Sequence, residues 1–192
     1  MKKKKNIIQA ATRLFAEQGY DGTTTLQIAG EAGVTEPLIY YHFKGKEELF
    51  SHILEVTFHE YFSRLDSLEK MTGTQFKRIE ALLDLHFRFV KEMPDEIYMG
   101  VSTCPARLRD PKHACSKITQ HQSERLMAYL RDCLEKGIRS GEFYKVPVSE
   151  TVEFLIALIY GLMRQRGLHL LEKEGMQEVT VDFCRRSLVK GR

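Results

Sequence analysis

The chain contains 192 residues, of which 43% are hydrophobic and 29% are charged. This balance is typical of a folded, water-soluble protein and excludes a disordered or fibrous chain. The net charge of +3 lies entirely within residues 1–46, so this end of the chain is the one that would meet a polyanion. Four of the positive charges in residues 1–46 are the lysines at 2–5. These lysines are equally consistent with a solvated, frayed chain end that contacts no polyanion.

Neither a membrane span nor a signal peptide is expected. The longest apolar run, residues 154–163, is shorter than the ~20 residues that cross a bilayer. The lysines at 2–5 resemble the charged start of a signal peptide, but the polar residues Asn6, Gln9 and Thr12 interrupt the apolar stretch that should follow them. We therefore expect a cytoplasmic protein.

Apolar residues recur at intervals of three and four along most of the chain, which is the periodicity of amphipathic helices. No segment shows the alternation that is typical of strands. Clusters of glycine and proline separate the periodic stretches. The sequence therefore predicts an all-α fold of about nine helices. The clearest stretches are residues 7–15, 26–32, 36–43, 46–68, 79–90, 118–134, 152–163 and 179–188.

Residues 23–43 have the features of two short helices joined by a tight turn. The three threonines at 23–25 can supply a capping hydroxyl for the first helix. Gly33 can adopt the left-handed conformation that ends this helix, and Thr35 can cap the second. Pro37 falls in the first turn of the second helix, where its missing N–H costs nothing. This spacing is typical of a helix-turn-helix.

A longer pattern surrounds these two helices: GYDGTT at 19–24, IA at 28–29, AGVT at 32–35 and LIYYHFKGKEEL at 38–49. With these motifs, residues 6–54 resemble the DNA-binding region of the TetR family of bacterial transcriptional regulators. The resemblance implies a helix-turn-helix DNA-binding domain in residues 1–46 and a helical ligand-binding and dimerisation domain in residues 47–192.

The resemblance also implies a function. The chain would be a ligand-responsive transcriptional regulator, with repression as the family's usual outcome. It would bind a palindromic, double-stranded DNA operator as a homodimer. A small-molecule effector in the C-terminal domain would release it, by preferring the state whose two recognition helices are wrongly spaced for DNA.

By the same resemblance, the second short helix would enter the major groove. Base contacts would come from Glu36, Pro37, Leu38 and Tyr40. Phosphate contacts would come from Thr25, Thr35, Tyr41, His42 and Lys46. We expect Thr25 and Thr35 to act as helix caps as well, and Ile39 and Phe43 to belong to the core.

Glu36 has two interpretations. Phosphates repel a carboxylate, so a base contact requires a hydrogen-bond donor, most simply cytosine N4. The helix macrodipole alone also favours a carboxylate at a helix start, by ~0.3 to 1 kcal/mol. Pro37 and Leu38 are apolar and suit a thymine methyl group. If Glu36 reads a base, its replacement by glutamine should move the preference from cytosine toward adenine.

The remaining three quarters of the chain begin with a connector helix over residues 46–68. The stretches 152–163 and 179–188 are candidates for a four-helix dimer interface, as the family resemblance implies, or for the core of one subunit. The middle of the chain lacks an acidic cluster, which favours a neutral or anionic apolar effector. The candidate pocket residues, most of which suit a core better than a pocket, are Phe62, His86, Phe87, Tyr98, His121, Arg125 and Tyr129.

Other function classes have less support. Paired carboxylates, GxSxG, a Walker loop and HExxH are all missing, so we expect no enzyme, no cofactor and no metal. A metal-sensing site at His113, Cys115 and His121 is conceivable, and so is redox sensing by Cys104 and Cys115, which have basic neighbours. Reduced, mostly buried thiols remain the main expectation for the cysteines. A helical interaction module without DNA binding is the third class, and the intact string at 40–46 argues against it.

Overall fold

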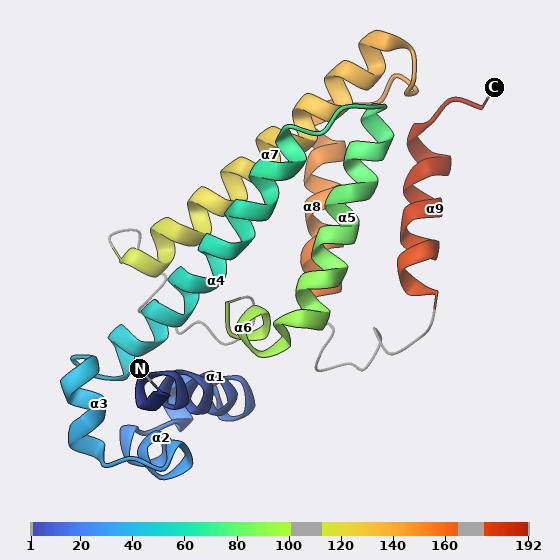
Figure 1. The fold of residues 1–192 in the computed structure, drawn as a ribbon. Coiled ribbons are helices and arrows are strands. Elements are labelled where there is room, and N and C mark those ends of the chain that lie inside the picture. Colours follow the sequence, from blue (N-terminus) through green and yellow to red (C-terminus); the bar gives the residue numbers. More distant parts are fainter. Residues whose placement is uncertain (1, 101–112, 165–174, 192) are drawn as a thin grey trace. The chain divides into compact units, whose positions relative to one another are not determined.

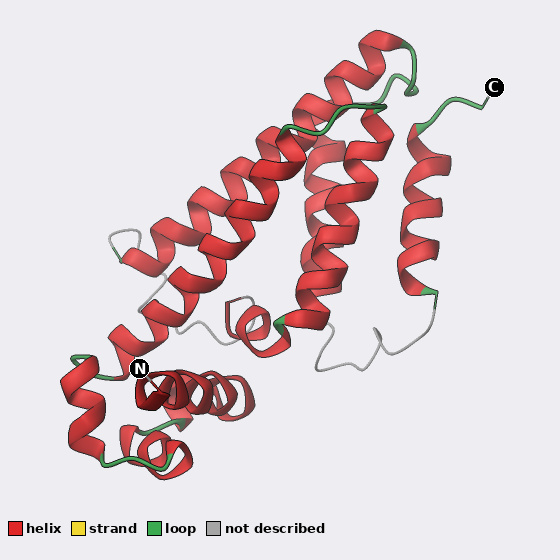
Figure 2. Cartoon of the chain, in the orientation of Figure 1, coloured by secondary structure: helices red, strands yellow, loops and turns green. Residues whose placement is uncertain are grey.

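The computed structural model describes residues 2–100, 113–164 and 175–191. Over these ranges the chain is all-α, which confirms the predicted fold class (Figure 2). The described helices, labelled in Figure 1, are α1 (Lys2–Gly22), α2 (Thr25–Ala32), α3 (Glu36–His42), α4 (Lys46–Glu69), α5 (Gln75–Glu92), α6 (Pro94–Tyr98), α7 (Ala114–Ser140), α8 (Val148–Met163) and α9 (Met176–Leu188).

The chain divides into two compact units. The first comprises residues 1–60 and 93–120, and the second comprises residues 61–92 and 121–192. Helices α4 and α7 contribute to both units, because each continues across a boundary between them. The predicted domain division after residue 46 stays a prediction.

The first unit has an apolar core to which α1, α2, α3 and the start of α4 all contribute. Its centre is an aromatic trio. The rings of Phe15 and Tyr20 are stacked with centroids 5.6 Å apart, and Phe50 meets them edge-on at 5.2 and 5.3 Å. Gly19 makes the trio possible, because its left-handed backbone (φ 76°) interrupts α1 and turns the chain just before Tyr20. This core fixes the helices that carry the predicted DNA contacts.

The second unit is built around α5, which packs against both α8 and α9. Apolar residues at helical spacing along α5, from Phe76 to Phe89, are buried. The buried residues of α8, from Val152 to Met163, follow helical spacing along one side of the helix. No helix in the described ranges is both long enough and apolar enough to cross a membrane.

Two cysteines lie in the core of the second unit. Cys133 in α7 and Cys184 in α9 are both buried as free thiols. Burial raises the pKa of each thiol to about 11. This agrees with the expectation of reduced, buried cysteines. Cys104 and the side chain of Cys115 lie outside the described residues, so redox sensing by this pair stays a hypothesis.

Candidate functional site

Helix α2 begins with a capping box that centres on Thr24. Its hydroxyl accepts a hydrogen bond from the Gln27 backbone N–H at 3.1 Å, and the Gln27 side chain accepts one from the Thr24 N–H at 2.8 Å. The expectation that Thr25 caps this helix is therefore wrong. Thr25 is already the first helical residue, so its hydroxyl is available for another partner.

The turn between α2 and α3 has the predicted geometry. Gly33 adopts the left-handed conformation, with φ 63° and ψ 40°. The N–H of Val34 then reaches back to the Ala29 carbonyl at 2.9 Å, which satisfies one of the exposed carbonyls at the end of α2. This closure sets the direction in which α3 leaves the turn.

Helix α3 starts without a capping side chain. Thr35 occupies the cap position, but its hydroxyl makes no capping hydrogen bond, so that expectation is also wrong. The reason is that both usual donors are unavailable. Pro37 has no N–H, and the N–H of Leu38 bonds to the backbone carbonyl of Thr35 at 3.0 Å. The exposed Thr35 hydroxyl is thus left facing solvent.

One side of α3 is anchored and the other is exposed. Ile39 and Phe43 are buried, which confirms their assignment to the core. On the opposite side, Tyr40 and Tyr41 are 53% and 80% exposed, and Pro37 is exposed as well. Leu38 is partly buried against the core of the first unit. An exposed aromatic face on a rigidly anchored helix is suited to contact with a partner.

A polar network joins α2 to α3. The Thr25 hydroxyl donates to Oε1 of Glu36 at 2.5 Å and lies 3.3 Å from the hydroxyl of Tyr40. These three residues were predicted to act separately, two on bases and one on a phosphate. The structure brings them together. Nothing in the sequence indicated this, because Thr25 and Glu36 are eleven residues apart on different helices.

Lys46 has partners inside the protein. Its ammonium donates to the backbone carbonyls of Tyr20 and Thr23 at 2.8 and 2.9 Å, and it lies 4.4 Å from the centre of the Tyr20 ring. These bonds tie the start of α4 to the end of α1. Its phosphate contact stays a prediction, as does that of His42, whose partly buried ring lies against Tyr41 at 5.0 Å.

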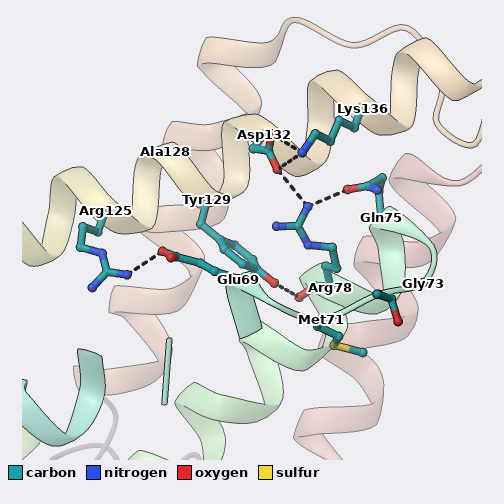
Figure 3. Close-up of a pocket in the computed structure, with 11 residues that line it drawn as sticks. Glu69, Met71, Gly73, Gln75, Arg78, Arg125, Ala128, Tyr129, Asp132 and Lys136 are labelled. Atoms are coloured by element: carbon teal, nitrogen blue, oxygen red, sulfur yellow. Dashed lines mark hydrogen bonds and ion pairs between the residues drawn. The ribbon is translucent and has the colours of Figure 1, made fainter. Parts of the chain in front are cut away.

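A groove of about 690 Å³ opens in the second unit beside the loop between α4 and α5 (Figure 3). Two of the seven predicted pocket residues, Arg125 and Tyr129, line it. Its remaining walls come from residues that the sequence did not single out: Glu69, Met71, Thr72, Gly73, Gln75, Arg78, Ala128, Asp132 and Lys136.

Arg78 is the central charge of this groove. The side chain is largely buried, and its guanidinium donates to Asp132 at 2.9 Å and to Gln75 at 3.0 Å. Lys136 also pairs with Asp132, at 2.8 Å. Although burial opposes it, the hydrogen bonds from Lys136 and Arg78 hold the pKa of Asp132 below its usual range. Two cations thus share one carboxylate at this end of the groove.

At the other end of the groove, Arg125 is held by two carboxylates. Its guanidinium pairs with Asp66 at 2.7 Å and with Glu69 at 2.6 Å. The ring of Phe62 lies 5.2 Å from this guanidinium and 5.2 Å from the ring of His121. Phe62 and His121 therefore lie near the groove residue Arg125 but do not line the groove themselves.

His86 belongs to a separate, buried polar network. Its Nδ1 lies 2.7 Å from the Leu82 carbonyl, and its Nε2 lies 3.3 Å from the hydroxyl of Tyr61. A carbonyl only accepts, so Nδ1 carries the proton and Nε2 accepts from Tyr61. Burial lowers the pKa of His86 to about 4, even though the bond to Leu82 opposes this shift. The imidazole is therefore neutral at pH 7.

The last two predicted pocket residues are also away from the groove. Tyr98 packs against the core of the first unit, and Phe87 is partly buried on α5. Within the described ranges, no three His, Cys, Asp or Glu residues are grouped to hold a metal ion. The structure thus presents an exposed helix-turn-helix face in one unit and a charged groove in the other.

Comparison with known proteins identifies this arrangement. Residues 7–53 match the sequence profile of the bacterial regulatory proteins of the tetR family. The negative transcriptional regulator IcaR of the biofilm operon icaADBC, from Staphylococcus epidermidis, is 30% identical over 130 residues, which cover 66% of this chain and 68% of IcaR.

Solved structures share the fold over nearly the whole chain. The ketosteroid regulator KstR2 of Mycobacterium tuberculosis superposes with a TM-score of 0.82 at 20% identity, covering 100% of this chain and 96% of KstR2. FadR of Bacillus subtilis, solved in complex with stearoyl-CoA, gives a TM-score of 0.70 at 18% identity, covering 94% and 96%. By sequence and by fold, the chain belongs to the TetR family of bacterial transcriptional regulators.

Proposed function

We propose that this chain is a ligand-responsive repressor that binds a palindromic operator as a homodimer in the cytoplasm and leaves it when a small molecule binds. The observation that carries the proposal is the exposed face of α3. Its aromatic side chains Tyr40 and Tyr41 project from a helix that the buried residues Ile39 and Phe43 hold in place. A rigid, exposed helix of this kind fits the major groove.

Within this proposal, the predicted contacts other than Thr25 keep their roles on the DNA. Glu36, Pro37, Leu38 and Tyr40 read base edges. Thr35, Tyr41 and His42 hold phosphates. Lys46 contacts the DNA backbone through the ammonium proton that it does not donate to the carbonyls of Tyr20 and Thr23. The lysines at 2–5 add positive charge at the start of α1, which strengthens the attraction to DNA at low salt.

Dimerisation is supported by an exposed apolar face on α8 and α9. Phe154 and Phe183 are each 54% exposed, and their ring centroids are 6.5 Å apart. Val179, one turn before Phe183 on α9, is also exposed. Large apolar side chains grouped on one surface are typical of protein interfaces. A second copy that covers this face would form a twofold dimer in which the two α3 helices are related by the symmetry axis.

The effector is assigned to the groove around Arg78. The groove has room for a small organic molecule, with the Tyr129 ring and Met71 as apolar walls. Arg78 and Lys136, which share the single carboxylate of Asp132, can also hold a ligand that carries a carboxylate or phosphate. This agrees with the anionic half of the prediction made from composition.

Electrophoretic mobility of the DNA upstream of the chain's own gene tests operator binding. We expect tight binding to one segment with a steep dependence on salt, and weaker binding by Tyr41→Ala, which removes an exposed ring without touching the core. Tyr144→Ala is the matched control, because Tyr144 is exposed far from α3 in sequence. Equal binding of the wild-type protein to every duplex would overturn the proposal.

Sedimentation tests the dimer. Phe183→Lys should convert dimers to monomers, since it places a charge on the exposed apolar face. Met127→Lys, an exposed apolar position on α7, should leave the dimer intact. A wild-type protein that sediments as a monomer at micromolar concentration would contradict this part of the proposal.

A reporter strain tests the effector site. When a library of small carboxylates and phosphates is screened for release of repression, a compound active on the wild type should fail on Lys136→Met. Lys77→Met, another exposed lysine beside this loop, should respond normally. If the compound releases repression equally in Lys136→Met and Lys77→Met, the groove is not the effector site.

A further inference from the structure

The network of Thr25, Glu36 and Tyr40 has a fixed hydrogen-bond direction. Carboxylate oxygens only accept, so the single proton of the Thr25 hydroxyl is committed to Oε1 of Glu36, at 2.5 Å. Thr25 has no second proton to give. In its 3.3 Å contact with Tyr40 the Thr25 oxygen must therefore accept, and the Tyr40 hydroxyl must donate.

This direction determines what the outer ends of the network offer to a partner. Among the described residues, Oε2 of Glu36 has no hydrogen-bond donor, and the Tyr40 oxygen keeps its lone pairs after giving its proton to Thr25. Both ends can thus accept hydrogen bonds and neither can donate one. A tyrosine hydroxyl without this contact could either donate or accept a hydrogen bond. The contact with Thr25 therefore restricts Tyr40 to accepting one from a partner.

We propose that this relay, from Tyr40 through Thr25 to Glu36, makes the reading face of α3 select exocyclic amino groups. In the major groove, donors are found only on cytosine N4 and adenine N6, whereas guanine presents the acceptors O6 and N7 and thymine presents O4. The base edges that Glu36 and Tyr40 approach are therefore cytosine or adenine. The inference rests on the proposed function, in which this face enters the groove of an operator.

Thr25 then acts as a positioning residue. Its hydroxyl is occupied in orienting Glu36, so it sets the base preference and does not hold a phosphate, contrary to its predicted role. The two roles differ in a measurable way. Loss of a phosphate contact weakens binding by a similar factor on all sequences, whereas loss of a positioning contact changes which base is preferred.

Selection from a random duplex library distinguishes these roles, with circular dichroism to confirm that each variant is folded. Changes in the consensus caused by Glu36→Gln and Tyr40→Phe identify the two base positions. In the wild type, both positions should carry cytosine or adenine. Thr25→Val frees the Tyr40 proton, so guanine or thymine should become acceptable at the Tyr40 position, and the preference for an amino group should fall about tenfold or more.

Thr25→Ser is the matched control, because it keeps the hydroxyl and should keep the wild-type consensus. A wild-type protein that enriches no sequence would refute the proposed function itself. A wild-type protein that enriches a clear motif with guanine or thymine at either position would leave the function standing and refute the relay. The same holds if Thr25→Val returns the wild-type consensus with uniformly weaker binding.

Discussion

Lowering the pH should destabilise the second unit through His86. The side chain is 2% exposed, and the carbonyl of Leu82 and the hydroxyl of Tyr61 occupy its two nitrogens. Protonation of Nε2 would bring two donors together, since Tyr61 already directs its proton there. The Gln122 side chain accepts a hydrogen bond from Tyr160 at 3.0 Å and donates one to the Tyr61 oxygen. These bonds oppose a rotation of the Tyr61 hydroxyl that would turn its proton away from His86.

The magnitude follows from the pKa of His86, which burial lowers from 6.5 to about 4. Between these two values the unfolded chain binds a proton that the folded chain excludes, so stability falls as the pH falls through this window. Above pH 6.5 both states are neutral and the effect vanishes. At pH 5 the loss is about 2 kcal/mol, and below pH 4 it approaches about 3 kcal/mol.

Urea denaturation at a series of pH values measures this loss, and the imidazole resonances observed by NMR identify its source. The His86 signal should not titrate between pH 8 and pH 5. His86→Gln should reduce the pH dependence by about 2 kcal/mol at pH 5, whatever its effect on stability at pH 7. An imidazole of His86 that titrates near pH 6.5 in the folded protein would refute the reasoning.

Four further substitutions should change stability in predictable directions, each measurable by thermal or urea unfolding. Gly137→Ala places a methyl group closer to the buried ring of Phe143 than van der Waals contact allows and should cost about 1 to 3 kcal/mol. Gly30→Ala, where the added carbon meets nothing within 4 Å, should stabilise by about 0.4 to 1 kcal/mol. Lys46→Met removes two charge-assisted bonds and should cost about 1.5 to 3 kcal/mol, whereas Thr24→Ala should lose about 1 kcal/mol with its capping box. Equal effects of the two glycine-to-alanine substitutions, or an unchanged midpoint for Lys46→Met or Thr24→Ala, would contradict these assignments.

Features that depend on neighbouring residues could be predicted from the sequence. Helical periodicity indicated the all-α fold, and Gly33 was expected in the left-handed conformation that it adopts. Ile39 falls on the inner side of α3, and Phe43, in extended backbone directly after the helix, is buried as well. The capping predictions were wrong by one residue at Thr25, because a run of threonines offers several equivalent caps and only the backbone decides among them.

Features that depend on the packing of distant segments could not be predicted. Lys46 finds its carbonyl partners 23 and 26 residues away, and Arg78 meets Asp132 across 54 residues. No spacing rule connects such pairs, since each requires the helices to be placed first. For this reason the sequence suggested seven separate pocket residues, of which the structure brings Arg125 and Tyr129 to the groove and keeps His86 in a buried network of its own.

The buried thiols of Cys133 and Cys184 have a practical consequence. Raising a thiol pKa from 9.0 to about 11 lowers the reactive thiolate fraction at neutral pH about a hundredfold. An alkylating reagent must also wait until α7 or α9 opens. The rate at which mass spectrometry detects modification at these two positions therefore reports how often the second unit opens, without any engineered label.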